Sequence, residues 1–356
     1  MTSIGQRKID HLDLCAREDV GFRGKTTLLE CVRLVHDALP ELHTDDVTTQ
    51  ITVLGKTLSA PIVIAAMTGG TDEAGRVNRE LASIAEERGF GFGLGSQRAM
   101  HRRPEAGESY RVRDVAKSAL LLGNLGLVQA RDMSTKAILE LIDEVRADAL
   151  CLHLNPAMEL VQPGGDRDFR GGLETLARLA RELPVPVVAK ETGCGLSAAV
   201  GMRLRAAGIR HADVSGSGGT SWVGVETKRA AAEGKEDARL LGEAFWDWGI
   251  PTAASVGQLA PLGFETLIAT GGIASGLDVA KALALGASCA GLARPVLKAL
   301  TSGGREGALR FLDGVCAELR AVMLLTGCRT PHALVRAPKI VVGELERWLA
   351  PSETSR

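Results

Sequence analysis

Short apolar runs alternate with helical patterns along most of the chain. Eight runs rich in β-branched and small residues predict buried strands, because each is short and ends at glycine or a polar group. Their ranges are 61–67, 90–95, 119–125, 149–154, 185–191, 211–216, 266–271 and 289–293. Helical patterns separate most of them, most clearly at 134–146, 173–183 and 197–207. This alternation predicts a parallel sheet, and eight units predict a closed (β/α)8 TIM barrel of the α/β class.

The barrel is predicted over residues 61–345, with a C-terminal tail at 346–356. Its regular spacing is interrupted at 217–248, which is charged and too polar for a barrel strand. We expect this insertion after the sixth strand to form a long loop or lid over the carboxyl ends of the strands. Residues 250–260 follow it and predict the sixth helix, with Pro251 near its first turn.

Residues 1–60 precede the first barrel strand and predict an N-terminal extension that packs on the barrel. Their pattern predicts a helix near 28–38 and a β-type stretch at 47–54. Arg7 and Lys8 stand near the start of this extension. A solvated terminus is the ordinary explanation for two such charges taken alone.

Composition agrees with a soluble globular protein and argues against several functional classes. Of the 356 residues, 45% are apolar and 24% charged, and the net charge of −1 argues against nucleic acid as a partner. No apolar run reaches the length of a membrane span, and the first residues lack a signal-peptide core. The seven cysteines are scattered without CxxC spacing, which predicts reduced thiols and a cytoplasmic protein.

The last two predicted strands carry a candidate phosphate site. Gly271 and Gly272 end the seventh strand, a helical pattern opens at Ser275, and Arg294 follows the eighth strand. Glycines let backbone N–H groups approach an anion closely, and a helix start and a cation favour negative charge. Because TIM barrels usually bind phosphate at the loops after strands seven and eight, this position favours a phosphate over a simple turn.

Polar residues also follow the other predicted strands. They are candidates for a functional site, since chemistry in this fold collects where the strands end. They are Met67, Thr68, Ser96, Gln97, Arg98, Asn124, His153, Asn155, Met158, Glu159, Lys190, Ser215 and Thr220. Each has an ordinary explanation alone, such as an ion pair for Lys190, but together they indicate a site at one face.

Lys190 has two chemical interpretations. A cation near the pyrimidine end of a flavin stabilises negative charge on the reduced ring. A lysine at a strand end can instead form a Schiff base with a sugar-like substrate. The phosphate signature at Gly271, Gly272 and Arg294 favours the flavin.

With these residues in place, the sequence resembles type 2 isopentenyl-diphosphate isomerase, the FMN-dependent enzyme of isoprenoid synthesis. The resemblance runs over nearly the whole chain, through RKIDHL, AAMTGGT, GLGSQR, HLNPAMELVQPGGDRDF, AKETGCGLS, VSGSGGTSW, ATGGIASGLDVAKALALGA and GLARP. The last two motifs recur in many FMN barrels. The RKxxH start, HLN…E and GGTSW are specific to this family.

The resemblance implies a set of site residues. Those expected to bind FMN are Ala65, Ala66, Met67, Thr68, Ser96, Asn124, Lys190, Ser215 and Thr220, with Gly271, Gly272, Ile273, Ala293 and Arg294 around its phosphate. Those expected at the substrate are Arg7, Lys8, Ser96, Gln97, Arg98 and Met158, with His153, Asn155 and the Met158 position in catalytic roles. Glu159 is expected to hold Mg²⁺.

The implied reaction moves the double bond of 3-methylbut-3-enyl diphosphate to give the 3-methylbut-2-enyl isomer. One carbon gains a proton and another loses one, with no net redox change. Reduced FMN would transfer the proton through N5, and NADPH would serve only to reduce the flavin. The family forms homo-oligomers, and a tetramer or octamer is expected here, in which Arg7 and Lys8 reach a neighbouring subunit's site or the closing lid.

Three positions depart from the family. Met158 replaces a glutamine placed near the reacting carbons, Gly164 replaces a glutamate, and Ala274 stands where arginine is frequent. A thioether cannot donate a proton, so the chain is either an isomerase in which the flavin shuttles the proton or a weak or non-catalytic relative that binds flavin and diphosphate. A 2-hydroxy-acid oxidase is a further alternative, but that class needs a histidine and an arginine after the sixth strand and active-site tyrosines.

Overall fold

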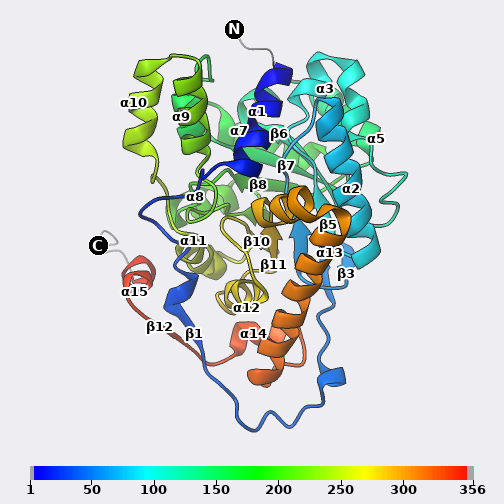
Figure 1. Cartoon of the computed structure of the whole chain (residues 1–356), viewed down its shortest axis with the longest axis vertical. Coiled ribbons are helices and arrows are strands. Elements are labelled where there is room, and N and C mark those ends of the chain that lie inside the picture. Colours follow the sequence, from blue (N-terminus) through cyan, green and yellow to red (C-terminus); the bar gives the residue numbers. More distant parts are fainter. Residues whose placement is uncertain (1–3, 351–356) are drawn as a thin grey trace.

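Eight parallel strands close into a barrel that helices surround (Figure 1). The computed structural model describes residues 4–350, and their side chains from Asp10 onward. The strands are β4 (Ile62–Ile64), β5 (Gly91–Gly93), β6 (Leu121–Gly126), β7 (Ala149–Leu154), β8 (Val187–Glu191), β9 (His211–Asp213), β10 (Thr266–Ala269) and β11 (Cys289–Leu292). They neighbour one another in chain order and β11 closes on β4. The predicted TIM barrel is therefore confirmed, strand by strand.

The surrounding helices begin where the sequence provides a cap. The side-chain oxygens of Thr71, Ser134, Ser197 and Ser275 each accept a hydrogen bond from the backbone N–H three residues on. The main helices are α2 (Asp72–Arg88), α5 (Thr135–Val145), α7 (Gly172–Glu182), α8 (Ala198–Ala206), α11 (Thr252–Leu259), α12 (Gly276–Ala284) and α13 (Arg294–Leu325). Shorter ones are α3 (Arg98–Arg102), α4 (Leu127–Arg131), α6 (Pro156–Val161) and α14 (Pro331–Arg336).

The barrel interior is a packed core at its amino end. Val63, Val188 and Ile268 point into one cluster together with side chains from a small hairpin below them. That hairpin consists of β2 (Ile51–Val53) and β3 (Lys56–Leu58), which pair in antiparallel fashion. Its apolar residues close the amino end of the barrel, so the carboxyl end is the one that remains open to ligands.

The N-terminal extension contains α1 (Ile4–Arg17) and then runs the length of the barrel (Figure 1). The helix predicted near 28–38 is wrong, because that stretch forms a short 3₁₀ turn and β1 (Val32–Leu34). β1 pairs in antiparallel fashion with β12 (Lys339–Val341), which lies some three hundred residues later. That distant partner satisfies the backbone of β1 and overrides the local helical pattern.

Residues 217–248, expected as a long loop, form a pair of helices instead. α9 (Trp222–Ala232) starts at Ser221, whose hydroxyl accepts from the Gly224 N–H, and α10 (Glu236–Phe245) packs against it. α9 lies beside α1 at one end of the molecule, and α10 lies on the other side of α9 (Figure 1). The role of this insertion as a lid stays a prediction.

The last described residues pack against the barrel helices. The expected tail overlaps α15 (Glu344–Leu349), which packs on α11. The Trp348 carbonyl accepts a hydrogen bond from the Gln258 side chain, and Leu345 is fully buried. Across residues 4–350, none of the helices combines the length and the apolar character that a membrane crossing requires.

Candidate active site

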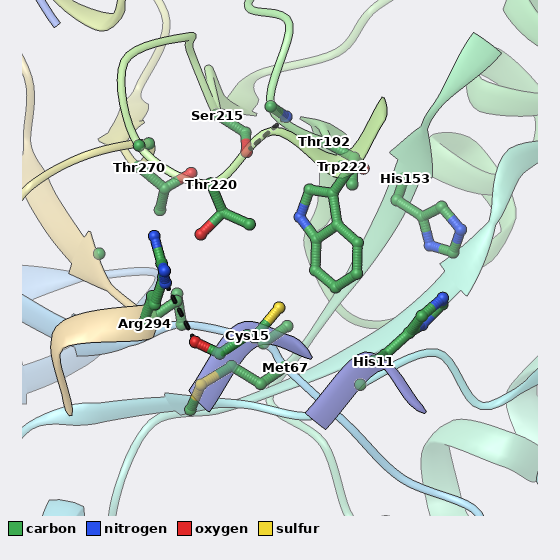
Figure 2. Close-up of a pocket in the computed structure, with 18 of the residues that line it drawn as sticks. His11, Cys15, Met67, His153, Thr192, Ser215, Thr220, Trp222, Thr270 and Arg294 are labelled. Carbon is green, nitrogen blue, oxygen red and sulfur yellow. Dashed lines mark hydrogen bonds between the residues drawn. The ribbon is translucent and has the colours of Figure 1, made fainter. Parts of the chain in front are cut away.

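One cavity of about 540 Å³ lies at the carboxyl ends of the barrel strands. All eight strands contribute a residue from their end or from the loop directly after it. These residues are Ala65, Ser96, Asn124, His153, Lys190, Ser215, Thr270 and Ala293. His11 and Cys15 of α1 and Trp222 of α9 also face this space (Figure 2). The cavity is therefore built by the barrel and covered by the N-terminal extension and the insertion.

Nearly all residues expected at the cofactor line this cavity. They are Ala65, Ala66, Met67, Ser96, Asn124, Lys190, Ser215, Thr220, Gly271, Gly272, Ile273, Ala293 and Arg294. Thr68 is the exception: it is buried outside the lining, and its hydroxyl has no hydrogen-bond partner among the described residues. These assignments to a cofactor remain a proposal, but their placement in one cavity is a structural fact.

The residues expected at the substrate are placed less uniformly. Arg98 and Met158 line the cavity, whereas Gln97 is fully buried and does not. The Gln97 side chain donates to the Leu141 carbonyl (2.9 Å) and accepts from the Asn124 N–H (3.0 Å), so it supports the strand ends. Arg7 and Lys8 belong to α1, but their side chains lie outside the part that the structure describes.

Lys190 is held by a buried ion pair that the sequence analysis missed. Its ammonium lies 2.8 Å from Asp213 Oδ2 and 3.3 Å from Thr270 Oγ1, and only 9% of the residue is exposed. The other Asp213 oxygen accepts from the Thr270 hydroxyl at 2.5 Å. A buried ammonium requires such a partner, because burying an unpaired charge is costly. Asp213 thus positions the cation at the floor of the cavity.

The end of the cavity where a phosphate is expected is formed by backbone conformations that favour glycine. Gly271 and Gly272 have φ values of +99° and +74°, in the left-handed region. A side chain on Gly219 would lie 2.4 Å from the Gly272 nitrogen, so the loops after β9 and β10 pack backbone to backbone. The first turn of α13, which begins at Arg294, completes this end. Backbone donors, a helix N-terminus and a cation together suit a bound phosphate.

Arg294 also holds the end of α1. Its Nε donates to the Cys15 carbonyl at 3.0 Å, and one Nη donates to the Glu18 carbonyl at 2.5 Å (Figure 2). Carbonyls at a helix C-terminus lack partners within the helix and carry partial negative charge, so a cation is favourable there. The same side chain therefore contacts both the cavity and the helix that covers it.

Ser215 adopts an unusual backbone conformation at the cavity wall. Its φ is +38°, although it is not glycine. The Ser215 carbonyl accepts from the N–H groups of Gly193 and Gly195, and its hydroxyl accepts from Gly193 (Figure 2). Such backbone strain persists only where surrounding contacts enforce it, and it is frequent at functional sites.

His153 lies on the opposite side of the cavity from Arg294 (Figure 2), and its ring is paired with Asn124. The Asn124 amide nitrogen donates to the Leu94 carbonyl at 3.1 Å, which leaves its oxygen as the acceptor for His153 Nδ1 at 2.8 Å. The proton of a neutral His153 therefore sits on Nδ1. This arrangement holds the imidazole ring in one orientation.

Glu159 presents a buried carboxylate with neutral donors around it. Its oxygens accept from the Asn155 amide (2.8 Å), the Asp166 N–H (2.8 Å) and the Gln162 amide (3.3 Å). None of these donors offsets its negative charge, so a cation is a suitable further partner. No cluster of three His, Cys, Asp or Glu residues exists among the described positions, so a metal here would need ligands from elsewhere.

Arg98 stands beside this carboxylate region with part of its hydrogen-bonding capacity unused. One Nη lies 3.6 Å from Asp166 Oδ2, and its buried Nε has no hydrogen-bond partner in the described chain. The Met158 sulfur is 3.9 Å from the Asn155 amide nitrogen and lines the same cavity. An unsatisfied guanidinium next to a carboxylate is suited to an anion that arrives with a metal.

A second buried network, also missed from sequence, joins α1 to α9. His11 Nε2 lies 2.7 Å from Glu226, and the other Glu226 oxygen is 2.7 Å from Arg229. Glu226 is fully buried, and the His11 ring packs edge-on against Trp222 at 5.4 Å between centroids. The RKxxH motif marks His11 in the sequence, but nothing there identifies Glu226 as its partner.

Comparisons with known proteins agree with this geometry. The FMN-dependent dehydrogenase family model matches residues 172–340. The isopentenyl-diphosphate delta-isomerase of Methanothermobacter thermautotrophicus is 44% identical over 347 residues, covering 97% of this chain and 96% of that protein. The isomerase of Thermococcus kodakarensis is 43% identical and covers 96% of this chain and 93% of that protein.

Solved structures support the fold alone. A mandelate oxidase structure with (S)-2-phenylpropionate superposes with a TM-score of 0.64 at 20% identity, covering 95% of this chain and 97% of that chain. A second mandelate oxidase structure, with 3,3-difluoro-2-hydroxy-3-phenylpropionic acid, gives 0.63 at 19% identity, covering 95% and 98%. At this identity the likeness establishes a shared barrel and no shared substrate.

Proposed function

The chain belongs to the isopentenyl-diphosphate delta-isomerase family, and on that premise we propose that it interconverts isopentenyl and dimethylallyl diphosphate using reduced FMN and Mg²⁺. The observation that supports the proposal is one cavity that carries Arg294 on one side and His153 on the other (Figure 2). Arg294 and the glycine loops lie on one side, and Arg98, His153 and Glu159 belong to the other. Such a cavity can receive two phosphorylated molecules at once.

The described residues fit FMN. The Thr192 hydroxyl is buried, lines the cavity and has no partner among the described residues, as expected where a polar ligand supplies one. Lys190 offers a cation near the ring, and Gly271 to Ile273 with Arg294 offer donors for the phosphate. When bound in its reduced form, FMN supplies an electron-rich ring and a nitrogen, N5, that exchanges a proton with the substrate.

The substrate diphosphate would be bound by Arg98 and His153, with Glu159 holding Mg²⁺. Mg²⁺ in proteins commonly takes one or two carboxylates and completes its shell with substrate phosphates and water, so a single glutamate suffices. The Asn155 amide holds one Glu159 oxygen at 2.8 Å and thereby orients the carboxylate. Arg7 and Lys8 of α1 are proposed as further cations at the diphosphate, and NADPH as the source of reducing equivalents.

Apolar side chains would protect the reacting carbons. Met67, Met158 and Trp222 line the same cavity. Carbon with cationic character is captured by water, so side chains that exclude water from the cavity favour loss of a proton over hydration. Met158 fits this shielding role even though it cannot donate a proton.

An oxidase of 2-hydroxy acids is the weaker alternative. Its active-site tyrosines have no counterpart here, because the only tyrosine, Tyr110, is fully buried and donates to the Ser96 carbonyl at 2.7 Å. Burial raises the pKa of its hydroxyl well above the ordinary value. The segment after β9 carries serine, glycine and threonine from Ser215 to Thr220, without the required histidine.

Proton exchange with solvent tests the proposal. Protein loaded with reduced FMN and Mg²⁺ is incubated with isopentenyl diphosphate in deuterated water, and both isomers are analysed by NMR and mass spectrometry. We expect deuterium in the new methyl group of dimethylallyl diphosphate. Binding of the diphosphate without any exchange would instead identify a non-catalytic relative that keeps the cofactor.

A further inference from the structure

We infer that Lys298 is a second cation for the phosphate group of the bound flavin, alongside Arg294. This inference rests on the proposed use of FMN. Lys298 follows Arg294 by four residues on α13, so the two side chains share one face of the helix. Both line the cavity, and Lys298 is exposed at its rim.

The surroundings place the Lys298 charge near that of Arg294. The Asp19 carboxylate lies 3.9 Å from an Arg294 Nη. The pKa of Asp19 is lowered mainly by a hydrogen bond from the Gly21 N–H, and the positive charges of Arg294, Lys228 and Lys298 add to this effect. Asp19 is fully exposed, so it is a weak partner that a phosphate can replace.

The other cations of the cavity either have close partners or, like Arg98, belong to the region around Asp166 and Glu159. Lys190 pairs with Asp213, Arg98 lies beside Asp166, and Arg294 donates to two carbonyls of the α1 end. The Lys298 carbonyl accepts from the Ser302 hydroxyl, but its ammonium forms no hydrogen bond or close ion pair with any residue that the structure describes. Of the cations near the glycine loops, it is therefore the one whose charge is most available to a ligand.

The negative charge of the phosphate exceeds the positive charge of Arg294 alone. A phosphate monoester carries about −1.5 to −2 charges at neutral pH, which a single guanidinium shared with helix carbonyls does not offset. Ala274, which follows the glycine loop and lines the same cavity, supplies no charge. An ammonium one turn inside α13 supplies the second positive charge without altering the glycine loops.

Comparison of two flavins isolates this contribution. FMN and riboflavin share the ring and the ribityl chain, and only FMN carries the phosphate. Apoprotein is titrated with each flavin, and the quenching of flavin fluorescence gives both dissociation constants. We expect Lys298→Ala to weaken FMN binding by roughly 3- to 10-fold, the range of a partly screened charge-assisted contact, and to leave riboflavin binding unchanged.

Two control variants and one replacement variant make the result specific. Lys298→Arg should retain the wild-type preference for FMN, because it keeps the charge. Lys136→Ala removes an exposed lysine on α5, away from the cavity lining, and should change neither constant. If Lys298→Ala is poorly folded by circular dichroism, Lys298→Gln replaces it.

The outcomes separate this inference from the proposed function. Wild-type protein that binds neither flavin would overturn both. Wild-type protein that prefers FMN, with the same preference in Lys298→Ala and Lys298→Gln, would overturn the role of Lys298 alone. A loss of preference in both variants, restored by arginine, would establish it.

Discussion

At the scale of single residues, Met158 is the departure from the resembled family that bears most directly on the proposed chemistry. Its sulfur lies against the Asn155 amide, and its side chain faces the cavity. The family that the sequence resembles is expected to carry a glutamine there. In the proposed reaction the flavin carries the proton, so we interpret the methionine as a wall of the cavity and not as a lost acid.

We predict that Met158→Gln retains or raises turnover of isopentenyl diphosphate. Glutamine has nearly the same length and adds an amide that can orient a proton. A positioned acid–base group commonly raises the rate by about a hundredfold or more. Steady-state kcat and KM measure the change. Met158→Leu keeps the apolar wall and should stay within a few-fold of wild type. A large fall for glutamine alone would mean that the cavity depends on the thioether.

Glu191 is a buried carboxyl group whose ionisation opposes folding. It lies beside Lys190, is 5% exposed, and accepts hydrogen bonds from the N–H groups of Cys194 and Gly195. Burial raises its pKa to about 8, and the N–H donors and Lys190 only partly oppose this rise. In the unfolded chain the pKa of the same group is about 4.3.

We therefore predict a loss of stability as the pH rises towards 8. Between the two pKa values the unfolded state releases the proton and the folded state keeps it, so rising pH favours unfolding. Glu191→Gln cannot ionise, so its stability relative to wild type should increase from about pH 5 to 8 and then level off. Urea unfolding across this range measures it. Glu140→Gln, on the exposed side of α5, should show no such trend.

The partners of site residues were harder to predict than the residues themselves. Lys190 stands out in the sequence because it ends a strand. Its partner Asp213 is paired with it by the register of β8 against β9. Glu226 lies in a segment that we expected to be a loop, so its burial under α1 had no signal in the sequence. Strand-end residues follow from local pattern, whereas their partners follow from register and packing.

At the scale of elements, the same contrast holds. The eight strands were predictable because short apolar runs bounded by glycine repeat regularly between capped helices. β1 was predicted as helix because its pairing with β12 is invisible to a local window. The helices of 217–248 were missed because their charged outer faces resemble a loop, although Val223 and Val225 are buried.

α1 is the element whose position depends most on a few buried contacts. His11 and Arg229 meet at Glu226, and Arg294 holds the last carbonyls of the helix. Removing one member of a buried charged network typically costs about 3–5 kcal/mol, because the remaining charge loses its partner. This loss should fall mainly on the docking of α1, since the network joins α1 to α9.

We predict that Glu226→Ala increases amide hydrogen exchange in α1 by tenfold or more and leaves the barrel strands protected. Hydrogen exchange with mass spectrometry resolves the two regions. Glu236→Ala is the matched control, since that glutamate pairs only with Arg239 on the exposed face of α10. Equal acceleration in α1 and in the strands would mean that Glu226 stabilises the whole fold and not the docking of one helix.

At the scale of the whole molecule, the site is an assembly of the entire barrel. Every strand contributes to the cavity, α1 and α9 cover it, and α13 supplies both Arg294 and Lys298. A ligand that needs all these parts binds only the folded state. Its binding free energy therefore appears as stability of the whole structure.

We predict that FMN raises the unfolding temperature of the complete chain as one unit. Free FMN at a hundred times its dissociation constant stabilises the folded state by about 2.7 kcal/mol. With an unfolding entropy of roughly 2 cal/mol/K per residue over 356 residues, the shift should be about 4 °C. Circular dichroism reports the barrel, and tryptophan fluorescence includes Trp222 at the cavity and Trp348 on α15. Both transitions should shift together, and riboflavin at the same concentration should shift them less because it lacks the phosphate.

A shift of the fluorescence transition alone would show that the flavin binds α1 and α9 without contacting the barrel. The donors around Lys190 and Gly271 argue against that outcome.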